Sequence, residues 1–467
     1  MIETHDVLAD LFDQAKLTSP TRDYVSFSGP VPQPPTRFLL SQAGAAIISA
    51  AGAAAAHLWF LRSGIRQHVN VNMLSAIAAL RSDYYCRVDG KKLPDHKNQI
   101  HGFYSTRDDR WIQIHCTQPH HRDGIIRFFN GLDNREAIER SIAKSWNAFD
   151  LEDALTGAQL CAGVVRRREE WMQHEHAKAV AKLPLFEIIR IGDSPPEPLP
   201  EADRPLSGIR VLDLTHVIAG PVGGRTLAEH GADVLRLNAP HRHLHKQQLV
   251  DFGHGKRSAY IDLHDARGIG QLKALIKHAD VFLQGYRPHA IAARGFSPET
   301  LATNRPGIIC VDLSAYGHQG PWRNKRGFDS LVQSVSGMVN METVDSNSLK
   351  PRHLPLPALD YCTGYLIGFA TMAALARRAT EGGSFLVKLS LCQTGHWIYN
   401  LGLNGEKITS GNCRLPEYED LQDALIDDQG PFGLVRHLAP IAKLSETPAR
   451  WTHPSTPYGT HAPEWIT

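Results

Sequence analysis

The sequence predicts an α/β protein with two parts: a large domain built on a Rossmann-like, doubly wound parallel sheet, and a smaller α+β domain. Two observations carry this prediction. From residue 208 onward, short apolar strand patterns alternate with longer helix patterns, which is typical of a parallel sheet covered by helices. Residues 193–207 are rich in proline and acidic side chains, so we interpret them as a linker between this part and a mixed segment before it.

Composition limits the classes of function. With 467 residues the chain is too long for one compact core, and its 42% hydrophobic and 21% charged residues are ordinary for a globular protein. The net charge of +2 predicts no general attraction to nucleic acid or to a membrane, so any anion site must be local. The seven cysteines form no CxxC pair and we find no secretory signal, so we expect reduced thiols and a cytoplasmic protein.

The chain before the linker divides into three parts. Residues 1–36 are polar and contain prolines, and we expect an N-terminal arm. Residues 37–75 hold an apolar helix pattern long enough to span a bilayer, followed by a strand pattern. Because alanine and glycine dominate this run and polar side chains interrupt it, we expect a helix packed inside the protein. The small α+β domain is predicted over residues 76–192, with a β-hairpin at 102–116 and a charged helix at 133–146.

The large domain is predicted over residues 208–400. Strands are expected at 208–214, 233–237, 258–263, 280–286, 307–317 and 385–391, and helices at 220–232 and 266–279. In such sheets ligands bind beyond the carboxyl ends of strands, which here hold residues 215–217, 286–288 and 314–317. Residues 401–467 form a tail that we expect to pack back on the large domain.

A helix–strand unit occurs twice, and the copies differ at an informative position. The first copy spans Phe38–Leu74 and the second spans Ala358–Cys392. Asp360 of the second copy corresponds to Leu40 of the first. A carboxylate kept in only one copy suggests that Asp360 does chemistry, and that two related pieces have been joined.

Several motifs of the large domain occur together and in the order found in a known family. The strings GIRVLDLTHVIAGPVGGRTLAEHGADVLRL, GKRSAYIDL, ADVFLQGYRPHAIAARGF, LSAYGHQGPW, RGFDSLVQSVSGM and LDYCTGYLIGFATMAAL resemble the class III (CaiB/BaiF-like) CoA-transferases, which include formyl-CoA transferase, carnitine CoA-transferase and α-methylacyl-CoA racemase. Residues 37–195 resemble the second half of a member, so the chain is similar to a rearranged, partly duplicated form. The resemblance implies a homodimeric CoA-transferase that uses acyl-CoA and small carboxylic acids as substrates, with no permanently bound cofactor.

The resemblance implies that Asp360 is the nucleophile. In the family an Asp at this position attacks the acyl-CoA thioester, which gives an aspartyl anhydride and then an aspartyl-CoA thioester. From the residues alone, Asp360 is also typical of an N-cap for the helix that begins near Tyr361. Both roles are compatible, because a helix N-terminus stabilises a nearby anion.

The phosphates of CoA require a few fixed cations, and four residues are candidates. They are Lys256, Arg257, Arg287 and Arg326. The resemblance matches Arg287 with a family CoA contact and Arg326 with a basic residue near the phosphates. A lone arginine is otherwise most often a solvated surface charge.

Other candidates follow the strands. The resemblance places His216, Val217 and Ile218 in a turn that lines the thioester site, beside a helix N-terminus whose N–H groups suit an oxyanion. Alternatively, these three residues form an ordinary strand-to-helix turn with no role in binding. Tyr316 follows another strand, in the string LSAYG, and we count it among the binding candidates.

Two other functions remain open. Racemisation needs two acid/base groups on opposite sides of the α-carbon, and the family's racemases pair the Asp with a His in a GHD motif. This chain has Phe328 at that position, in the string GFD, which argues against racemisation. The rearranged order leaves a non-catalytic acyl-CoA-binding homologue as the third possibility.

Histidine groups raise the question of a metal. The string HRHLHK contains His241, His243 and His245, and a second group lies between His115 and His121. Neither group has an acidic partner or a CxxC framework in the sequence, so we expect polar loops and no metal site.

Overall fold

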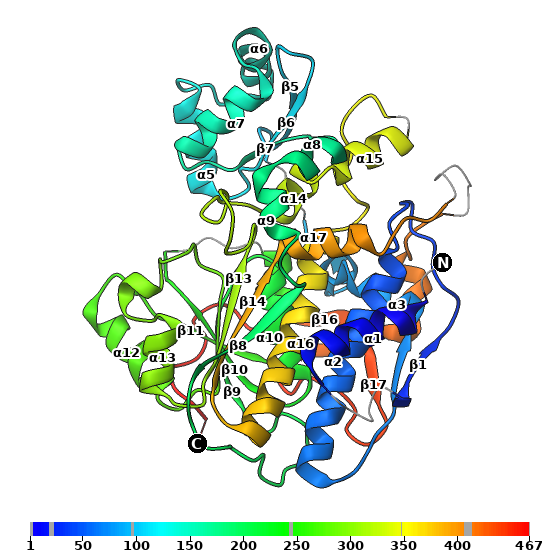
Figure 1. The fold of residues 1–467 in the computed structure, drawn as a ribbon, viewed down its shortest axis with the longest axis vertical. Coiled ribbons are helices and arrows are strands. Elements are labelled where there is room, and N and C mark those ends of the chain that lie inside the picture. The colour runs from blue at the N-terminus through cyan, green and yellow to red at the C-terminus, as the bar shows by residue number, and fades with distance from the viewer. Residues whose placement is uncertain are drawn as a thin grey trace.

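The protein is built around one large, mainly parallel β-sheet (Figure 1). The computed structural model describes residues 3–17, 23–94, 98–241, 246–346, 348–405 and 413–466. Seven strands form this sheet in the order β11-β10-β9-β12-β13-β14-β8. Their bounds are β11 Lys256–Tyr260, β10 Asp233–Asn238, β9 Arg210–Leu214, β12 Val281–Gln284, β13 Ile309–Ser314, β14 Ser384–Ser390 and β8 Phe186–Gly192. All neighbours pair in parallel except β8, which pairs antiparallel with β14.

Helices cover both faces of the sheet, which is why its central strands are runs of buried apolar residues. One face carries α12 (Ala266–Ile276) and α13 (Pro298–Asn304), and the other carries α10 (Ala219–Glu229) and α16 (Ala358–Glu381) (Figure 1). The predicted doubly wound α/β fold is therefore confirmed.

The duplicated unit appears as two similar runs of elements. The first run is α2 (Leu40–Ser63), β2 (Val69–Asn72) and α3 (Met73–Ala79), and the second is α16, β14 and α17 (Leu391–Asn400). Helices α2 and α16 pack against each other, and both are long and apolar enough to cross a membrane. Most of each helix is buried inside the protein instead, as the sequence predicted for the first copy.

The small domain lies apart from the large sheet (Figure 1) and has its own hydrophobic core. Its antiparallel sheet consists of β5 (Gly102–Ser105), β6 (Trp111–Ile114) and β7 (Ala162–Val164). The helices α5 (Pro119–Phe128), α6 (Arg135–Ser145) and α7 (Ala148–Gly157) accompany it. The predicted hairpin and charged helix are confirmed, and the hairpin turn contains Asp109 in the left-handed conformation, with φ 55°.

Two segments do not lie in the domains to which the sequence assigned them. Strand β8 falls within the predicted small domain, residues 76–192, but it forms the edge of the large sheet. The predicted arm, residues 1–36, contains α1 (Thr4–Ala15), which packs on α2, and β1 (Val25–Ser28), which pairs with β2. Both segments pair with strands far away in the sequence. Such pairing cannot be predicted from local composition.

The sequence predicts that the tail packs on the large domain, and its strands also pair with elements of the N-terminal half. The tail contains η3 (Tyr418–Ala424), β15 (Leu425–Gly430), β16 (Gly433–Leu438) and β17 (Ala442–Leu444). Strand β16 pairs with β3 (Arg87–Val88), which pairs with β4 (Lys91–Lys92), and β17 pairs with β2. The indole N–H of Trp465 donates to the carbonyl of Leu275 in α12 at 3.0 Å. The remaining helices are α4 Ser82–Tyr85, α8 Arg168–Gln173, α9 Glu175–Val180, α11 Lys246–Phe252, η2 Ala292–Arg294, α14 Asp329–Val335 and α15 Met338–Asp345.

Candidate active site

A cavity of about 830 Å³ lies at the carboxyl ends of β9, β12 and β13. Side chains at the start of α5, in the small domain, form another part of its wall. The cavity therefore lies between the two domains. Of the predicted site residues, those that line it are His216, Val217, Arg287, Tyr316, Arg326 and Asp360.

Asp360 lies in the first turn of α16 and is only 7% exposed. The backbone N–H of Ala219, the first residue of α10, donates a hydrogen bond to its carboxylate. Burial, and then the charge of Asp329, nevertheless raise the pKa of Asp360 well above its usual range. The helix end favours the charged form of Asp360, whereas burial favours the protonated form. Asp360 is thus a poorly solvated carboxyl group at the cavity wall.

Asp329 is the functional residue that sequence reasoning missed. Its Oδ2 accepts the backbone N–H of Asp360 at 2.8 Å, and it also accepts the N–H of Leu359. The Gln333 amide donates to its other oxygen and itself accepts the N–H of Leu354 at 2.9 Å. Asp329 thus satisfies N–H groups at the start of α16 and fixes the backbone of Asp360. The available signal is the acid of the GFD string, which directly follows Phe328.

The two helices that meet at Asp360 approach closely because small residues lie between them. A Cβ added to Gly223 of α10 would lie 2.5 Å from Ile367 Cγ2, and one added to Gly364 of α16 would lie 2.6 Å from Val222 Cβ. No side chain fits at these separations without movement. The glycines therefore set the distance between the start of α10 and the carboxylate.

The turn between β9 and α10 forms another wall of the cavity. Val217 has φ 70°, a left-handed conformation that β-branched residues rarely adopt. The His216 ring packs edge-on against Tyr286, with 5.6 Å between ring centroids. Backbone strain of this kind clusters at functional sites. Ile218 is also in this turn, but it is 8% exposed and packs in the main core rather than on the cavity.

Tyr316 borders the cavity with a ring that is almost wholly buried. Burial raises the pKa of its phenol well above the usual value. Its hydroxyl has no hydrogen-bond partner in the described part of the chain. The hydroxyl is itself buried, so it offers no exposed polar atom to a ligand in this structure.

Arg287 and Arg326 supply positive charge to the cavity. Burial, and then the charge of Arg287, lower the pKa of Arg326, so the two guanidinium groups lie close enough to repel each other. Within the described ranges, neither forms a salt bridge with a carboxylate. Two adjacent cations without a carboxylate partner indicate a site for an anion such as phosphate.

The structure does not bring Lys256 and Arg257 to this cavity, which corrects their selection as phosphate contacts. Lys256 is fully buried, and its Nζ lies 2.8 Å from Asp213 Oδ2 beneath α10. Arg257 pairs with both oxygens of Asp233 and donates to the carbonyl of Glu464 at 2.7 Å. Their positive charges form ion pairs and hydrogen bonds that stabilise the fold.

Phe328 and two histidines of the small domain lie beside each other. His115 stacks on the Phe328 ring, with 3.8 Å between centroids and 12° between planes. His121 lines the cavity, and its Nε2 lies 3.9 Å from Cys161 Sγ. Burial, and then neighbouring cations, lower the pKa of His121 to about 4, so its ring is neutral at neutral pH.

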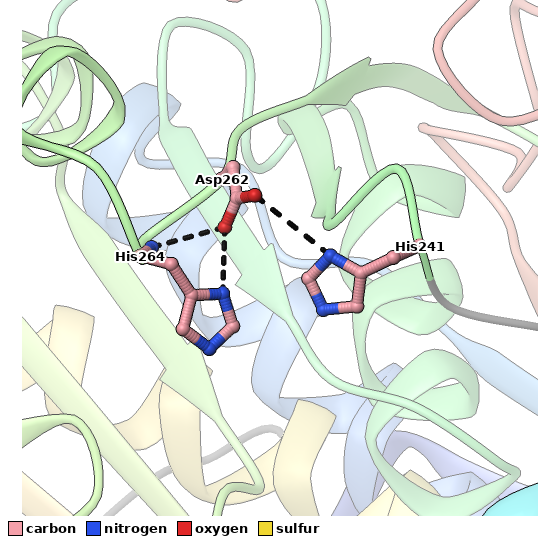
Figure 2. A group of neighbouring side chains, drawn as sticks. All are labelled: His241, Asp262 and His264. Carbon is pink, nitrogen blue, oxygen red and sulfur yellow. Dashed lines mark hydrogen bonds and ion pairs between the residues drawn. The ribbon is translucent and has the colours of Figure 1, made fainter.

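Some histidines acquire acidic neighbours that the sequence did not indicate. His241 and His264 flank the carboxylate of Asp262 (Figure 2). The expectation that His241 lacks an acidic partner is therefore wrong, because β10 and β11 are neighbours and the residues after them meet. His243 and His245, from the same string, lie outside the described residues.

The fold and the site define an α/β protein in which a buried carboxylate and a pair of cations share one cavity. The family model for CoA-transferase family III matches residues 24–184 and 206–417. The chain belongs to CoA-transferase family III, in a form with two matching segments.

Similar proteins carry related names. The chain is 32% identical over 304 residues to an acyl-CoA transferase of Gibberella moniliformis, which covers 60% of this chain and 53% of that protein. It is 27% identical to the succinyl-CoA:glutarate CoA-transferase of Mus musculus, over 40% of this chain and 45% of that protein. A crystal structure from M. tuberculosis is 31% identical, with a TM-score of 0.40 over 42% of this chain and 57% of that chain. The chain thus spans about half the length of the curated relatives it matches.

Proposed function

We propose that this protein is an enzyme that transfers CoA between carboxylic acids through a covalent intermediate on Asp360. The observation that carries the proposal is one cavity that contains both the Asp360 carboxylate and the cations Arg287 and Arg326. CoA needs both features, because its thioester must reach a nucleophile while its phosphates bind positive charge. Membership of the family and the names of the relatives support CoA transfer.

The proposed reaction exchanges acyl partners on the carboxylate. An Oδ of Asp360 attacks the thioester carbonyl carbon and the C–S bond breaks, which leaves a mixed aspartyl anhydride and CoA thiolate. The thiolate then attacks Cγ of Asp360, releases the donor acid as a carboxylate and leaves an aspartyl-CoA thioester. The acceptor carboxylate attacks this thioester, and the released thiolate attacks the new acyl group. Asp360 is restored, and no net proton or electron is consumed.

The surroundings of Asp360 suit these steps. Each attack passes through an oxyanion, and the start of α10 lies beside the carboxylate, to which the Ala219 N–H donates. Asp329 holds the backbone of Asp360 through the hydrogen bond of 2.8 Å. We therefore assign Asp329 as a positioning residue and the start of α10 as the anion-stabilising element.

We further propose that the enzyme uses acyl-CoA and small carboxylic acids, needs no permanently bound cofactor, and acts in the cytoplasm as a homodimer. Seven cysteines are free, which suits a reducing compartment. Light scattering tests the assembly, and a monomer at working concentration would contradict the dimer.

One observation favours α-methylacyl-CoA racemisation as a second candidate function. His121 lines the same cavity as Asp360, so a second acid/base group is available although Phe328 replaces the usual histidine. Racemisation would exchange the α-proton of an acyl-CoA with solvent without a covalent enzyme adduct. Deuterium incorporation therefore separates the two candidates.

The proposal can be tested by chemical trapping of the covalent intermediate on Asp360. The protein is incubated with a panel of acyl-CoA thioesters, treated with hydroxylamine or borohydride, and digested for mass spectrometry of the peptide that contains Asp360. The hydroxamate or alcohol of Asp360 supports the transferase, and Asp133→Asn, an exposed acid, provides the matched control. Full transfer activity in Asp360→Ala would refute the proposal. Deuterium uptake without an adduct would favour the racemase, and bound CoA with neither outcome would favour a binding protein.

A further inference from the structure

Three side chains at the cavity wall face one another from neighbouring strands (Figure 2). His241 follows β10, and Asp262 and His264 follow β11. The two strands pair in parallel, so the residues after them meet at one edge of the sheet. The acyl transfer on Asp360 uses none of these three residues.

We propose that His241, Asp262 and His264 bind a first-row transition-metal ion, for which Zn²⁺ is the best match. Each residue offers one ligand atom, and the three atoms lie within 4.8 Å of one another. Two imidazole nitrogens and one carboxylate oxygen favour Zn²⁺, Ni²⁺ or Cu²⁺ over Mg²⁺ and Ca²⁺, which prefer oxygen ligands.

The distances fit an ion after small side-chain rotations. Asp262 Oδ1 lies 2.8 Å from His264 Nδ1, and Asp262 Oδ2 lies 3.8 Å from His241 Nδ1. These separations involve different oxygens of Asp262. Ligand atoms about 2.0–2.1 Å from a tetrahedral ion are about 3.3 Å apart, so the side chains must rotate to bring in three atoms that already lie within 4.8 Å of one another. The histidine side chains are 54% and 64% exposed, so the rings can turn without disturbing a core.

The carboxylate is also held in place from behind. Asp262 Oδ1 accepts the backbone N–H of His264 at 2.9 Å. Hydrogen bonds of this kind orient a metal ligand and limit the entropy lost on binding. Three protein ligands leave a fourth position for water or for an oxygen of an anion in the cavity. A bound ion would add positive charge to the cavity that already contains Arg287.

A second group, formed by His254, Asp428 and His437, has a different explanation. Its two rings are stacked, with 3.6 Å between centroids and 22° between planes, so lone pairs in the ring planes do not point at one ion. His437 Nδ1 lies 3.0 Å from the Leu438 carbonyl, and its Nε2 lies 3.1 Å from Asp428 Oδ2. Both ring nitrogens of His437 therefore already have protein partners, which leaves neither free to bind an ion.

Metal titration of the full-length protein tests the proposal. After dialysis against a chelator, Zn²⁺ is added in a calorimeter, and Co²⁺ serves as a visible-absorption probe of coordination. We expect one ion per chain with a Kd of about micromolar order. Asp262→Asn and His264→Ala should each weaken binding at least about tenfold and change the Co²⁺ spectrum. His278→Ala, which alters an exposed histidine outside the group, should bind as the wild type does.

Two outcomes would overturn the proposal. Equal Zn²⁺ affinity in the wild type and in His264→Ala would place the ion elsewhere, and so would an equal loss in His278→Ala. Circular dichroism of each variant verifies folding, and Asp262→Asn gives a second reading with little change in shape. None of these measurements depends on transferase activity, so they stand apart from the test of Asp360.

Discussion

Replacement of Asp329 by asparagine would show how the site controls the charge of Asp360. In the wild type, Asp329 accepts the N–H of Asp360 at 2.8 Å, and its charge adds to burial in raising the pKa of Asp360. An asparagine keeps an oxygen for the hydrogen bonds but removes the charge. We therefore expect the pKa of Asp360 to fall, so that the acid limb of kcat/KM moves to lower pH.

The magnitude follows from the separation of the two groups. Since the Asp329 oxygen lies 2.8 Å from the backbone nitrogen of Asp360, side-chain lengths place the two carboxyl groups about 6 Å apart. At an effective dielectric constant of about 20, two unit charges at about 6 Å repel by about 3 kcal/mol. The substitution also turns a donor toward the Gln333 amide, which should cost about 1 kcal/mol of stability.

The assay has two readouts. Initial rates of CoA transfer are measured across the acid and neutral pH range at constant ionic strength. The fraction of Asp360 trapped as hydroxamate is measured in the same samples, because this readout does not depend on product release. Asp133→Asn is the control, and thermal unfolding confirms that the variants are folded. An acid limb that stays in place in Asp329→Asn, or moves to higher pH, would refute the reasoning.

Three further predictions concern binding and stability. Arg287→Ala should weaken CoA binding by about 1.5–3 kcal/mol in calorimetry, because a charged hydrogen bond is lost; an equal loss in the exposed Arg267→Ala would contradict a specific phosphate site. Gly223→Val should lower the free energy of unfolding in urea by about 1–3 kcal/mol, because its Cβ would lie 2.5 Å from a side chain of α16. Gly270→Ala, with open space around it, should raise that free energy by about 0.4–1 kcal/mol, and the same sign in both variants would count against this packing argument. Asp360→Asn should stabilise the protein at neutral pH on the order of 1 kcal/mol but not in strong acid. The raised pKa means that folded wild type retains a proton that the unfolded chain releases, so wild-type stability falls as pH rises. If Asp360→Asn were no more stable than wild type at neutral pH, burial would not disfavour the charged form of Asp360.

The fold class follows from the sequence alone, because the alternation of apolar strands and helices depends only on residues close together in the chain. The hairpin at 102–116 and the helix–strand duplication follow from the same local patterns. Comparison of the two copies also pointed to Asp360, since the other copy has Leu40 at the corresponding position. Motif order in the large domain was sufficient to identify the family.

Tertiary structure decided which residues share the site, because that depends on strand order and on how closely helices approach. Asp329 reaches Asp360 only because α14 and α16 meet, and His121 joins the cavity only because the small domain covers the strand ends. Lys256 matched the expected chemistry of a phosphate ligand, yet its register on β11 buries it against Asp213. The sequence gives the charge of a side chain, whereas packing between distant segments decides which group it pairs with. That is why the sequence indicated Asp360 as a candidate but did not indicate its hydrogen-bond partner Asp329.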